Sequence, residues 1–176
     1  MITKWKIDPA HSEIQFKVKH LMITTVTGHF TSYNLLVETE DSDFTKATKI
    51  DFTADADSIT TGNVQRDGHL KSADFFDVAQ FKVIAFKGNK AEKSRDEYQL
   101  HGDLTIKDVT KRVTLKVEHG GTVVDPYNQT KTGFSLTGKI SRKEFGLTWD
   151  AVTEAGSVVV GDEIKINCEV QLIKGE

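Results

Sequence analysis

Residues 98–107 read Tyr-Gln-Leu-His-Gly-Asp-Leu-Thr-Ile-Lys, and this stretch decides the fold class. Every even-numbered position from 98 to 106 carries an apolar residue or glycine, and every odd-numbered position carries a polar one. Side chains of a β-strand alternate between its two faces, so a period of two indicates one wet face and one apolar face. The stretch therefore predicts a half-buried strand.

The same alternation recurs along most of the chain, and no long stretch of helical period separates the repeats. About eight strands of this kind are typical of an antiparallel sheet that closes as a barrel or folds as a sandwich. The sequence therefore predicts an all-β fold. Strong alternation also lies at residues 13–20, 50–57, 112–118, 134–140 and 164–172, and weaker alternation at 5–8, 33–37 and 81–87.

Residues 58–77 interrupt the alternation for longer than any other segment. Because asparagine and serine are favoured at helix N-caps, Thr61-Gly62-Asn63 predicts the start of a short helix and Ser72-Ala73-Asp74 predicts the start of another. Functional residues concentrate on connections that a rigid scaffold holds. We therefore expect a short helical insertion around residues 58–77, placed as a lid or mouth.

Length and composition exclude several protein classes. With 176 residues and 19.6 kDa, the chain is long enough for about one domain, so residues 1–176 are expected to form a single domain. The net charge of −3 gives no reason to expect nucleic acid as a partner. The longest apolar run, Val83–Phe86, is far shorter than the roughly 18 residues of a transmembrane helix, so no transmembrane segment is expected.

The amino-terminal residues and the single cysteine bear on location. Cys168 cannot form an internal disulfide, so nothing in the sequence requires an oxidising compartment. Residues 1–6 lack the apolar core of a secretory signal. We therefore expect a cytoplasmic protein, or a periplasmic or secreted one if a leader was removed.

Small residues stand at the middle of several inward faces, at Ala54, Ala56, Gly102 and Gly138. A barrel that is filled by its own side chains usually places large residues there, so these positions allow a cavity. The glycines are equally compatible with bulges or bends of a filled barrel. Strands of about ten residues would give a barrel about 25 Å tall, long enough for an alkyl or prenyl chain.

Four cationic or titratable residues are candidates for contact with a ligand head group. His20 and Arg142 continue the parity of apolar inward faces at strand ends, and a buried Arg142 needs a carboxylate neighbour or an anionic ligand. Arg66 and His69 lie in the irregular insertion. They could hold a head group, or Arg66 could pair with Asp67 or another carboxylate and fix the loop.

Motifs for metal binding and catalysis are missing from the sequence. The six histidines show no spacing of a metal site, so no metal and no cofactor is expected. No Gly-x-Ser-x-Gly motif is present, and Cys168 has apolar inward neighbours, as expected for a small hydrophobic residue rather than a nucleophile. We therefore assign no catalytic residue.

Short motifs follow one another in a recognisable order along essentially the whole chain. They are Trp5-x-Ile7-Asp8-Pro9-x-His11-Ser12, Phe16-x-Val18-x-His20-Leu21, Gly28-x-Phe30, Arg66-Asp67-x-His69-Leu70, Ser72-x-Asp74-Phe75, Gly102-x-Leu104-Thr105-Ile106, Val109-Thr110-Lys111, Arg142-x-x-Phe145-Gly146 and Val160-Gly161-Asp162-x-Ile164. In this succession the chain resembles the YceI-like family of polyisoprenoid-binding, lipocalin-like proteins.

The resemblance implies an extended eight-stranded antiparallel lipocalin-like barrel around a long hydrophobic pore. It also implies a bound amphiphile, such as a polyprenyl phosphate, an isoprenoid quinone or a fatty amide, and a homodimer. Many members of the family carry a secretory leader, which these 176 residues do not show.

We therefore expect non-enzymatic binding, storage or transport of a long-chain isoprenoid or other amphiphilic lipid in the pore. One alternative is an enzyme or accessory factor that modifies an isoprenoid or a quinone through His20, His69 or Arg142. Another is a structural or stress-response module whose cavity is filled by side chains. The residues expected to line the pore are Phe16, Val18, Phe52, Ala54, Ala56, Leu70, Phe75, Leu100, Gly102, Leu104, Phe134, Leu136, Gly138, Ile166 and Cys168.

Overall fold

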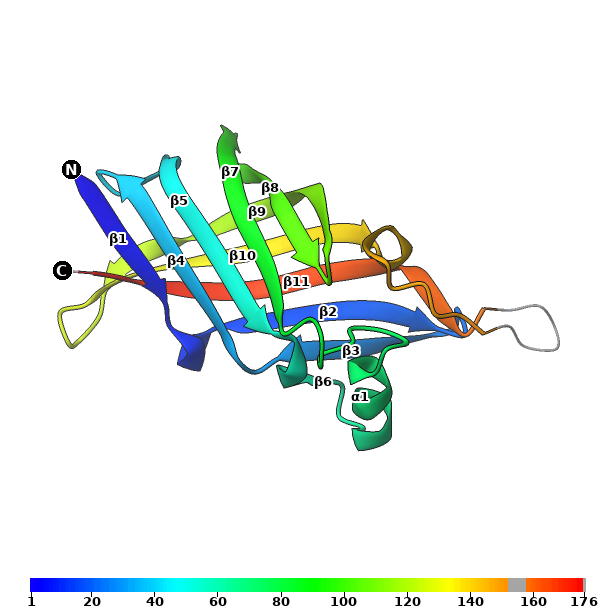
Figure 1. The fold of residues 1–176 in the computed structure, drawn as a ribbon. Coiled ribbons are helices and arrows are strands. Elements are labelled where there is room, and N and C mark those ends of the chain that lie inside the picture. Colours follow the sequence, from blue (N-terminus) through cyan, green and yellow to red (C-terminus); the bar gives the residue numbers. More distant parts are fainter. Residues whose placement is uncertain (152–157, 176) are drawn as a thin grey trace.

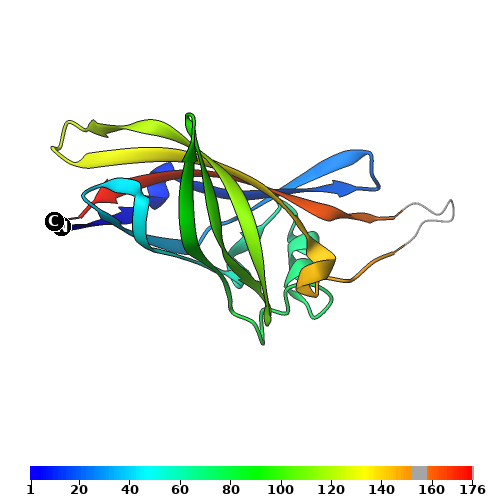
Figure 2. The same ribbon diagram turned by 90° about the horizontal axis from the view of Figure 1, so that it is seen from above.

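A single antiparallel sheet dominates the computed structural model, which describes residues 1–151 and 158–175 (Figures 1 and 2). One α-helix, α1 (Val64–Lys71), and three short 3-10 helices, η1 (Pro9–His11), η2 (Ala56–Ser58) and η3 (Arg142–Phe145), interrupt it. The strands are β1 (Ile2–Ile7), β2 (Glu13–His20), β3 (Thr24–Phe30), β4 (Tyr33–Glu40), β5 (Asp43–Asp55), β6 (Ile59–Thr60), β7 (Val83–Ser94), β8 (Glu97–Ile106), β9 (Val109–Val124), β10 (Thr130–Ser141) and β11 (Val160–Lys174).

These eleven segments form eight strands around a barrel. β1 and β2 both pair with β11, so they are two halves of one bent strand. By the same criterion β4 and β3 form the next strand, because they pair with β1 and β2, and β5 and β6 form the one after it. Pairing of β1 with β11 closes the barrel. The predicted all-β, eight-stranded antiparallel barrel with a short helix is confirmed.

The bend between β1 and β2 is encoded locally. Pro9 has no backbone N–H to donate to a neighbouring strand, so regular pairing stops there. The Asp8 carboxylate accepts a hydrogen bond from the Ala10 N–H at 3.1 Å and caps η1. The Ser12 hydroxyl oxygen then accepts from the Gln171 N–H at 3.0 Å, which returns the chain to β11.

The predicted insertion contains one helix rather than two. Asn63 caps α1 as expected, because its side-chain oxygen accepts from the Arg66 N–H at 3.0 Å. The predicted second start at Ser72 is wrong: Ser72 ends α1 by donating its N–H to the His69 carbonyl, and residues 73–76 form turns. No helix among the described residues is long and apolar enough to cross a membrane.

The alternation pattern missed β3 and the two-residue β6. β3 carries Gly28 on its inward face, directly opposite Phe16 of β2. A β-carbon at Gly28 would collide with the Phe16 ring, so the aromatic side chain covers the glycine. Because a glycine stands where the alternation would have a large apolar residue, the hydrophobic period does not identify β3.

The two termini lie at one end of the barrel (Figure 1), and aromatic side chains fill this end. Phe44 lies between Trp5 and Phe134, with ring centroids 5.2 and 4.8 Å away, and His119 stacks on Phe134 at 4.8 Å. The Trp5 indole N–H donates to the buried Thr39 hydroxyl at 3.1 Å. We call this cluster of Trp5, Phe44, His119 and Phe134 the filled end.

Candidate ligand-binding site

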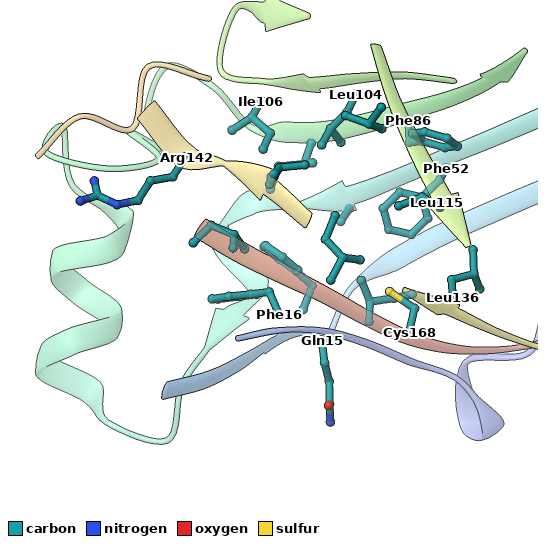
Figure 3. A pocket seen from close by; sticks show the side chains of 18 of the residues that line it. Gln15, Phe16, Phe52, Phe86, Leu104, Ile106, Leu115, Leu136, Arg142 and Cys168 are labelled. Carbon is teal, nitrogen blue, oxygen red and sulfur yellow. The ribbon is translucent and has the colours of Figure 1, made fainter. Parts of the chain in front are cut away.

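A cavity of about 230 Å³ extends from the middle of the barrel toward the end that carries α1 and η3 (Figure 3). Inward side chains of β2, β3, β4, β5, β7, β8, β9, β10 and β11 form its wall, and Leu70, Phe75 and Phe76 cover it from α1 and the following turns. A buried water needs only roughly 10–15 Å³ by a comparable measure, so the cavity has room for a much larger guest.

The wall is almost entirely apolar. Among the described residues that line it, only Gln15, Arg142 and the thiol of Cys168 carry polar side-chain atoms. Gln15 points away from the other lining side chains (Figure 3). Burial raises the pKa of Cys168 to about 11, so the thiol stays protonated at neutral pH and acts as a small hydrophobic group.

Arg142 is 2% exposed and is held by backbone carbonyls at the end of β10. Its Nε–H donates to the Gly161 carbonyl at 2.8 Å, and its Nη1 donates to the carbonyls of Leu147 and Trp149 at 2.6 and 2.7 Å. Its Nη2 donates to the Val160 carbonyl at 3.2 Å. The guanidinium therefore ties η3 and the segment after it to the start of β11.

Backbone carbonyls take the place of the carboxylate neighbour that was one of the two expected partners of Arg142. No carboxylate among the described residues lies within 4.0 Å of it, and four carbonyl oxygens take four of its five N–H donors. Burial lowers the pKa of Arg142, whereas the more distant Asp150 and Asp162 raise it. A guanidinium stays protonated in proteins, so this end of the barrel holds a fixed positive charge.

Arg66 fixes the entry to α1. It is exposed, its Nε–H donates to the Thr61 hydroxyl at 2.7 Å, and its Nη2 donates to the Thr61 carbonyl at 2.8 Å. Asp67 accepts hydrogen bonds from the N–H and hydroxyl of the same threonine at 2.8 and 2.6 Å. Arg66 and Asp67 thus hold the loop through Thr61 rather than by pairing directly.

His69 reaches the Arg142 region through an aromatic contact. Its Nε2 lies 2.9 Å from the Asp74 carboxylate, and its ring packs edge-on against Phe75 and Trp149, with centroids 5.1 and 4.9 Å away. The Trp149 carbonyl is one of the acceptors of Arg142. His69 therefore contacts the ring of Trp149, and Arg142 binds the backbone carbonyl of the same residue.

The four predicted head-group residues lie at one end of the barrel, but they do not form one cluster. His20 is exposed at the end of β2, opposite Val160, whose carbonyl accepts from Arg142. Of the four, only Arg142 lines the cavity. Contact of His20, Arg66, His69 or Arg142 with a head group stays a prediction.

Most of the predicted pore-lining residues lie in the cavity wall. The cavity wall contains, of the residues expected to line the pore, Phe16, Val18, Phe52, Ala54, Leu70, Phe75, Leu100, Leu104, Leu136, Ile166 and Cys168. Two others are displaced along the barrel: Ala56 lies in η2, and Phe134 belongs to the filled end.

Gly102 and Gly138 do not line the cavity, contrary to expectation. A β-carbon on Gly102 would lie 2.5 Å from the Phe86 ring, and one on Gly138 would lie 2.5 Å from Leu115 Cδ2. Each glycine makes room for a large side chain on a neighbouring strand, so the space beside it is occupied by protein. The cavity is real, but these glycines do not create it.

Several wall residues escaped the sequence assignment. Ile84 and Phe86 lie in the run Val83–Phe86, where apolar residues on both faces hide the parity that would identify the inward side. Phe76 and Leu147 lie outside the regular strands, where no period applies. The apolar run was the only signal that pointed to the first pair.

In the part of the chain that the structure describes, no group of three or more His, Cys, Asp or Glu side chains is placed to hold a metal ion. The titratable groups nearest the cavity are a thiol kept protonated and a guanidinium bound to carbonyls. The wall therefore offers burial of apolar surface as its main chemistry.

Comparisons with known proteins agree with this architecture. The YceI-like domain profile matches residues 5–172. The UPF0312 protein of Staphylococcus aureus strain USA300 is 36% identical over 171 residues, covering 97% of each chain. The crystal structure of the Campylobacter jejuni YceI protein matches with a TM-score of 0.76 and 34% identity, covering 90% of each chain.

A more distant solved structure has the same fold. It is a polyisoprenoid-binding domain from Saccharophagus degradans that is implicated in plant cell wall breakdown. It matches with a TM-score of 0.67 at 13% identity, covering 97% of this chain and 98% of the other.

Proposed function

The chain belongs to the YceI-like domain family, and from this premise we propose that it binds, stores or transports a long-chain isoprenoid lipid without converting it chemically. The isoprenoid tail would lie in the cavity, with the head group toward α1 and η3. The S. degradans domain, which is named for binding polyisoprenoids, supports this ligand class by analogy.

One observation carries the proposal: a cavity of about 230 Å³ whose wall is apolar except for one cationic side chain and one protonated thiol. An apolar protein cavity of roughly 150 Å³ stays dry and takes up an apolar guest such as benzene. Burial of hydrocarbon contributes about 0.8 kcal/mol per CH₂, so a longer chain binds more tightly for as long as it stays inside.

The head group of the ligand is proposed to lie outside the cavity rather than within it. Four of the five N–H donors of Arg142 are bound to carbonyls, so a phosphate in the cavity would find little hydrogen bonding there. Arg66, His69 and Lys71 of α1 lie next to the same end and would be available to a phosphate or quinone oxygen. A homodimer and a cytoplasmic location stay predictions.

The two tryptophans lie in different regions and allow a direct binding test. Trp149 packs 5.4 Å from Phe75 in the cavity wall, whereas Trp5 belongs to the filled end. In a Trp5→Phe background, titration with geranylgeraniol should therefore change the Trp149 fluorescence in a saturable manner. The shorter geraniol should bind at least tenfold more weakly.

A filled-cavity variant provides the control. Cys168→Phe places a large ring in the cavity and should abolish the fluorescence change while the melting temperature holds, because a void accepts the added volume. Cys168→Ala should bind as the parent does. Saturable binding that survives Cys168→Phe would overturn the proposal.

A further inference from the structure

The turn between β2 and β3 lies at the far end of the barrel from the termini (Figure 1), and apolar side chains are exposed on it. Met22 is 56% exposed and Ile23 is 77% exposed, and the half-buried Leu21 precedes them. Large apolar residues at the tip of a hairpin gain nothing from folding, since they remain in water. We call residues 21–23 the apolar tip.

The backbone of the apolar tip is strained for the residues it carries. Leu21 and Met22 have φ values of 52° and 59°, and the Ile23 N–H donates to the His20 carbonyl at 3.1 Å. Two successive positive φ angles mark a type I′ turn, which favours Asn-Gly and costs an ordinary side chain roughly 1–2 kcal/mol. The chain therefore carries apolar residues here against local preference.

The turn between β4 and β5 gives an internal comparison. Its central residues, Asp41 and Ser42, also have positive φ values, of 50° and 67°. Short polar residues such as these are common in turns, because their side chains hydrogen-bond the local backbone. Two successive positive φ angles thus fall on ordinary turn residues at one site and on Leu-Met at the other.

A row of lysines lies on the outer face beside the apolar tip. Lys17 of β2 lies directly opposite Lys165 of β11, and Lys165 lies opposite Lys139 of β10. Like charges that face each other across strands are destabilising. Lys139 has Glu163 at 3.3 Å, whereas Lys17, Lys19 and Lys165 have no carboxylate within 4.0 Å in the described ranges 1–151 and 158–175.

The apolar tip is also close to the cavity. Val18, three residues before the tip, lines the cavity wall. Val160, another wall residue, pairs with His20, and the Leu21 N–H donates to the Val159 carbonyl at 2.8 Å. A surface that binds the apolar tip would therefore lie next to this end of the cavity.

We propose that the apolar tip and the lysine row form a docking surface for a lipid bilayer with anionic head groups. Met22 and Ile23 would enter the acyl region, and Lys17, Lys19 and Lys165 would lie against lipid phosphates. The surface goes beyond the proposed lipid binding in the cavity and does not depend on it. It would place the α1 end of the barrel at the membrane from which an isoprenoid is taken.

Flotation with vesicles tests the docking surface. Wild-type protein should float with vesicles of phosphatidylcholine and 30% phosphatidylglycerol (a composition of roughly physiological charge) and bind phosphatidylcholine alone at least tenfold more weakly. The variant Leu21→Asn/Met22→Gly/Ile23→Ser installs a favoured type I′ turn, so it should keep or raise the melting temperature and lose at least tenfold in vesicle affinity.

A matched control comes from the opposite end. Val123 and Val124 are 64% and 63% exposed near the β9–β10 turn, so Val123→Ser/Val124→Ser removes comparable apolar surface and should float as wild type. The tip variant should still bind geranylgeraniol by Trp149 fluorescence, which separates loss of docking from loss of the cavity function. Equal flotation of tip variant and wild type, or no flotation of wild type, would overturn the proposal, as would equal binding to neutral vesicles.

Discussion

The two ends of the barrel are closed by different chemistry. At the filled end, Trp5, Phe44, His119 and Phe134 pack ring against ring. At the other end, side chains of the strands leave a cavity, and Arg142 closes the structure by binding backbone carbonyls. The same alternating strands supply both ends, so the difference lies in the size of the inward residues and in what reaches them from the connections.

This contrast separates stability from binding. Removing volume from a close-packed cluster opens a void, whereas removing volume beside an existing cavity mainly enlarges it. We therefore expect substitutions at the filled end to lower the free energy of unfolding and to leave ligand affinity alone. Substitutions in the cavity wall should change ligand affinity and should cost less free energy of unfolding than comparable ones at the filled end.

Arg142→Met should have the largest effect on stability and is the exception to that rule. It would leave four buried or partly buried carbonyls without their donor, at roughly 1–3 kcal/mol for each unsatisfied group, so a loss of about 4 kcal/mol or more is expected in urea unfolding. Arg66→Met, at an exposed arginine of the same end, should cost about 1 kcal/mol or less. Equal losses of unfolding free energy for the two variants would contradict the role given to the four carbonyl partners of Arg142.

Phe134→Ala against Leu136→Ala compares the two ends on one strand. Phe134 is 8% exposed within the filled end, so its loss should cost about 3–5 kcal/mol and spare geranylgeraniol binding. Leu136, two residues along on the same face, lines the cavity and should cost about 2 kcal/mol while changing the affinity. Denaturant unfolding and Trp149 fluorescence measure the two quantities. Loss of binding with Phe134→Ala alone would reverse the assignment.

Val117→Ala and Val113→Ala make the same comparison with identical chemistry. Both valines face inward on β9, but Val117 is 6% exposed in the core and Val113 lines the cavity. The cost should be about 2 kcal/mol for Val117 and about 1 kcal/mol for Val113, because the second leaves less new void. The two losses of stability are compared through the midpoints of urea unfolding curves that have equal slopes. A larger loss of stability for Val113→Ala would show that the side chains around Val113 are closely packed and leave no cavity there.

His119 gives the filled end a pH dependence. Partial burial against Phe134 lowers the pKa of His119, so the unfolded chain binds its proton more readily than the folded one. Stability should then be unaffected above about pH 6.5 and should decline as the pH falls below that value. Melting temperatures from pH 7.5 to 5 should fall less in His119→Gln than in wild type. Parallel curves for the two proteins would refute this role.

How much of this could be predicted from sequence follows from the same contrast. Alternation identified the barrel and part of the cavity wall, because strands impose a period of two that selects one face. It failed at Gly102 and Gly138, because a glycine in a strand leaves space that a neighbouring Phe86 or Leu115 takes, and the neighbour is known only from the register.

Arg142 shows a second limit. Its inward position at a strand end was predicted from parity, whereas its partners were not, because the four carbonyls come from residues 147–161, where no side-chain pattern records a backbone acceptor. Phe44, at the heart of the filled end, was missed for a related reason: no alternation marks the start of β5. Residues that act through irregular backbone leave the weakest sequence signal.

The central claim is that a long-chain lipid occupies the cavity, and the native Cys168 tests it most directly. Its thiol lies in the cavity wall and is the single cysteine of the chain, so mass spectrometry can follow its reaction with N-ethylmaleimide at alkaline pH. Saturating geranylgeraniol should slow this labelling at least tenfold, in step with occupancy measured by Trp149 fluorescence. Stoichiometric binding of geranylgeraniol with an unchanged labelling rate would show that the lipid binds elsewhere.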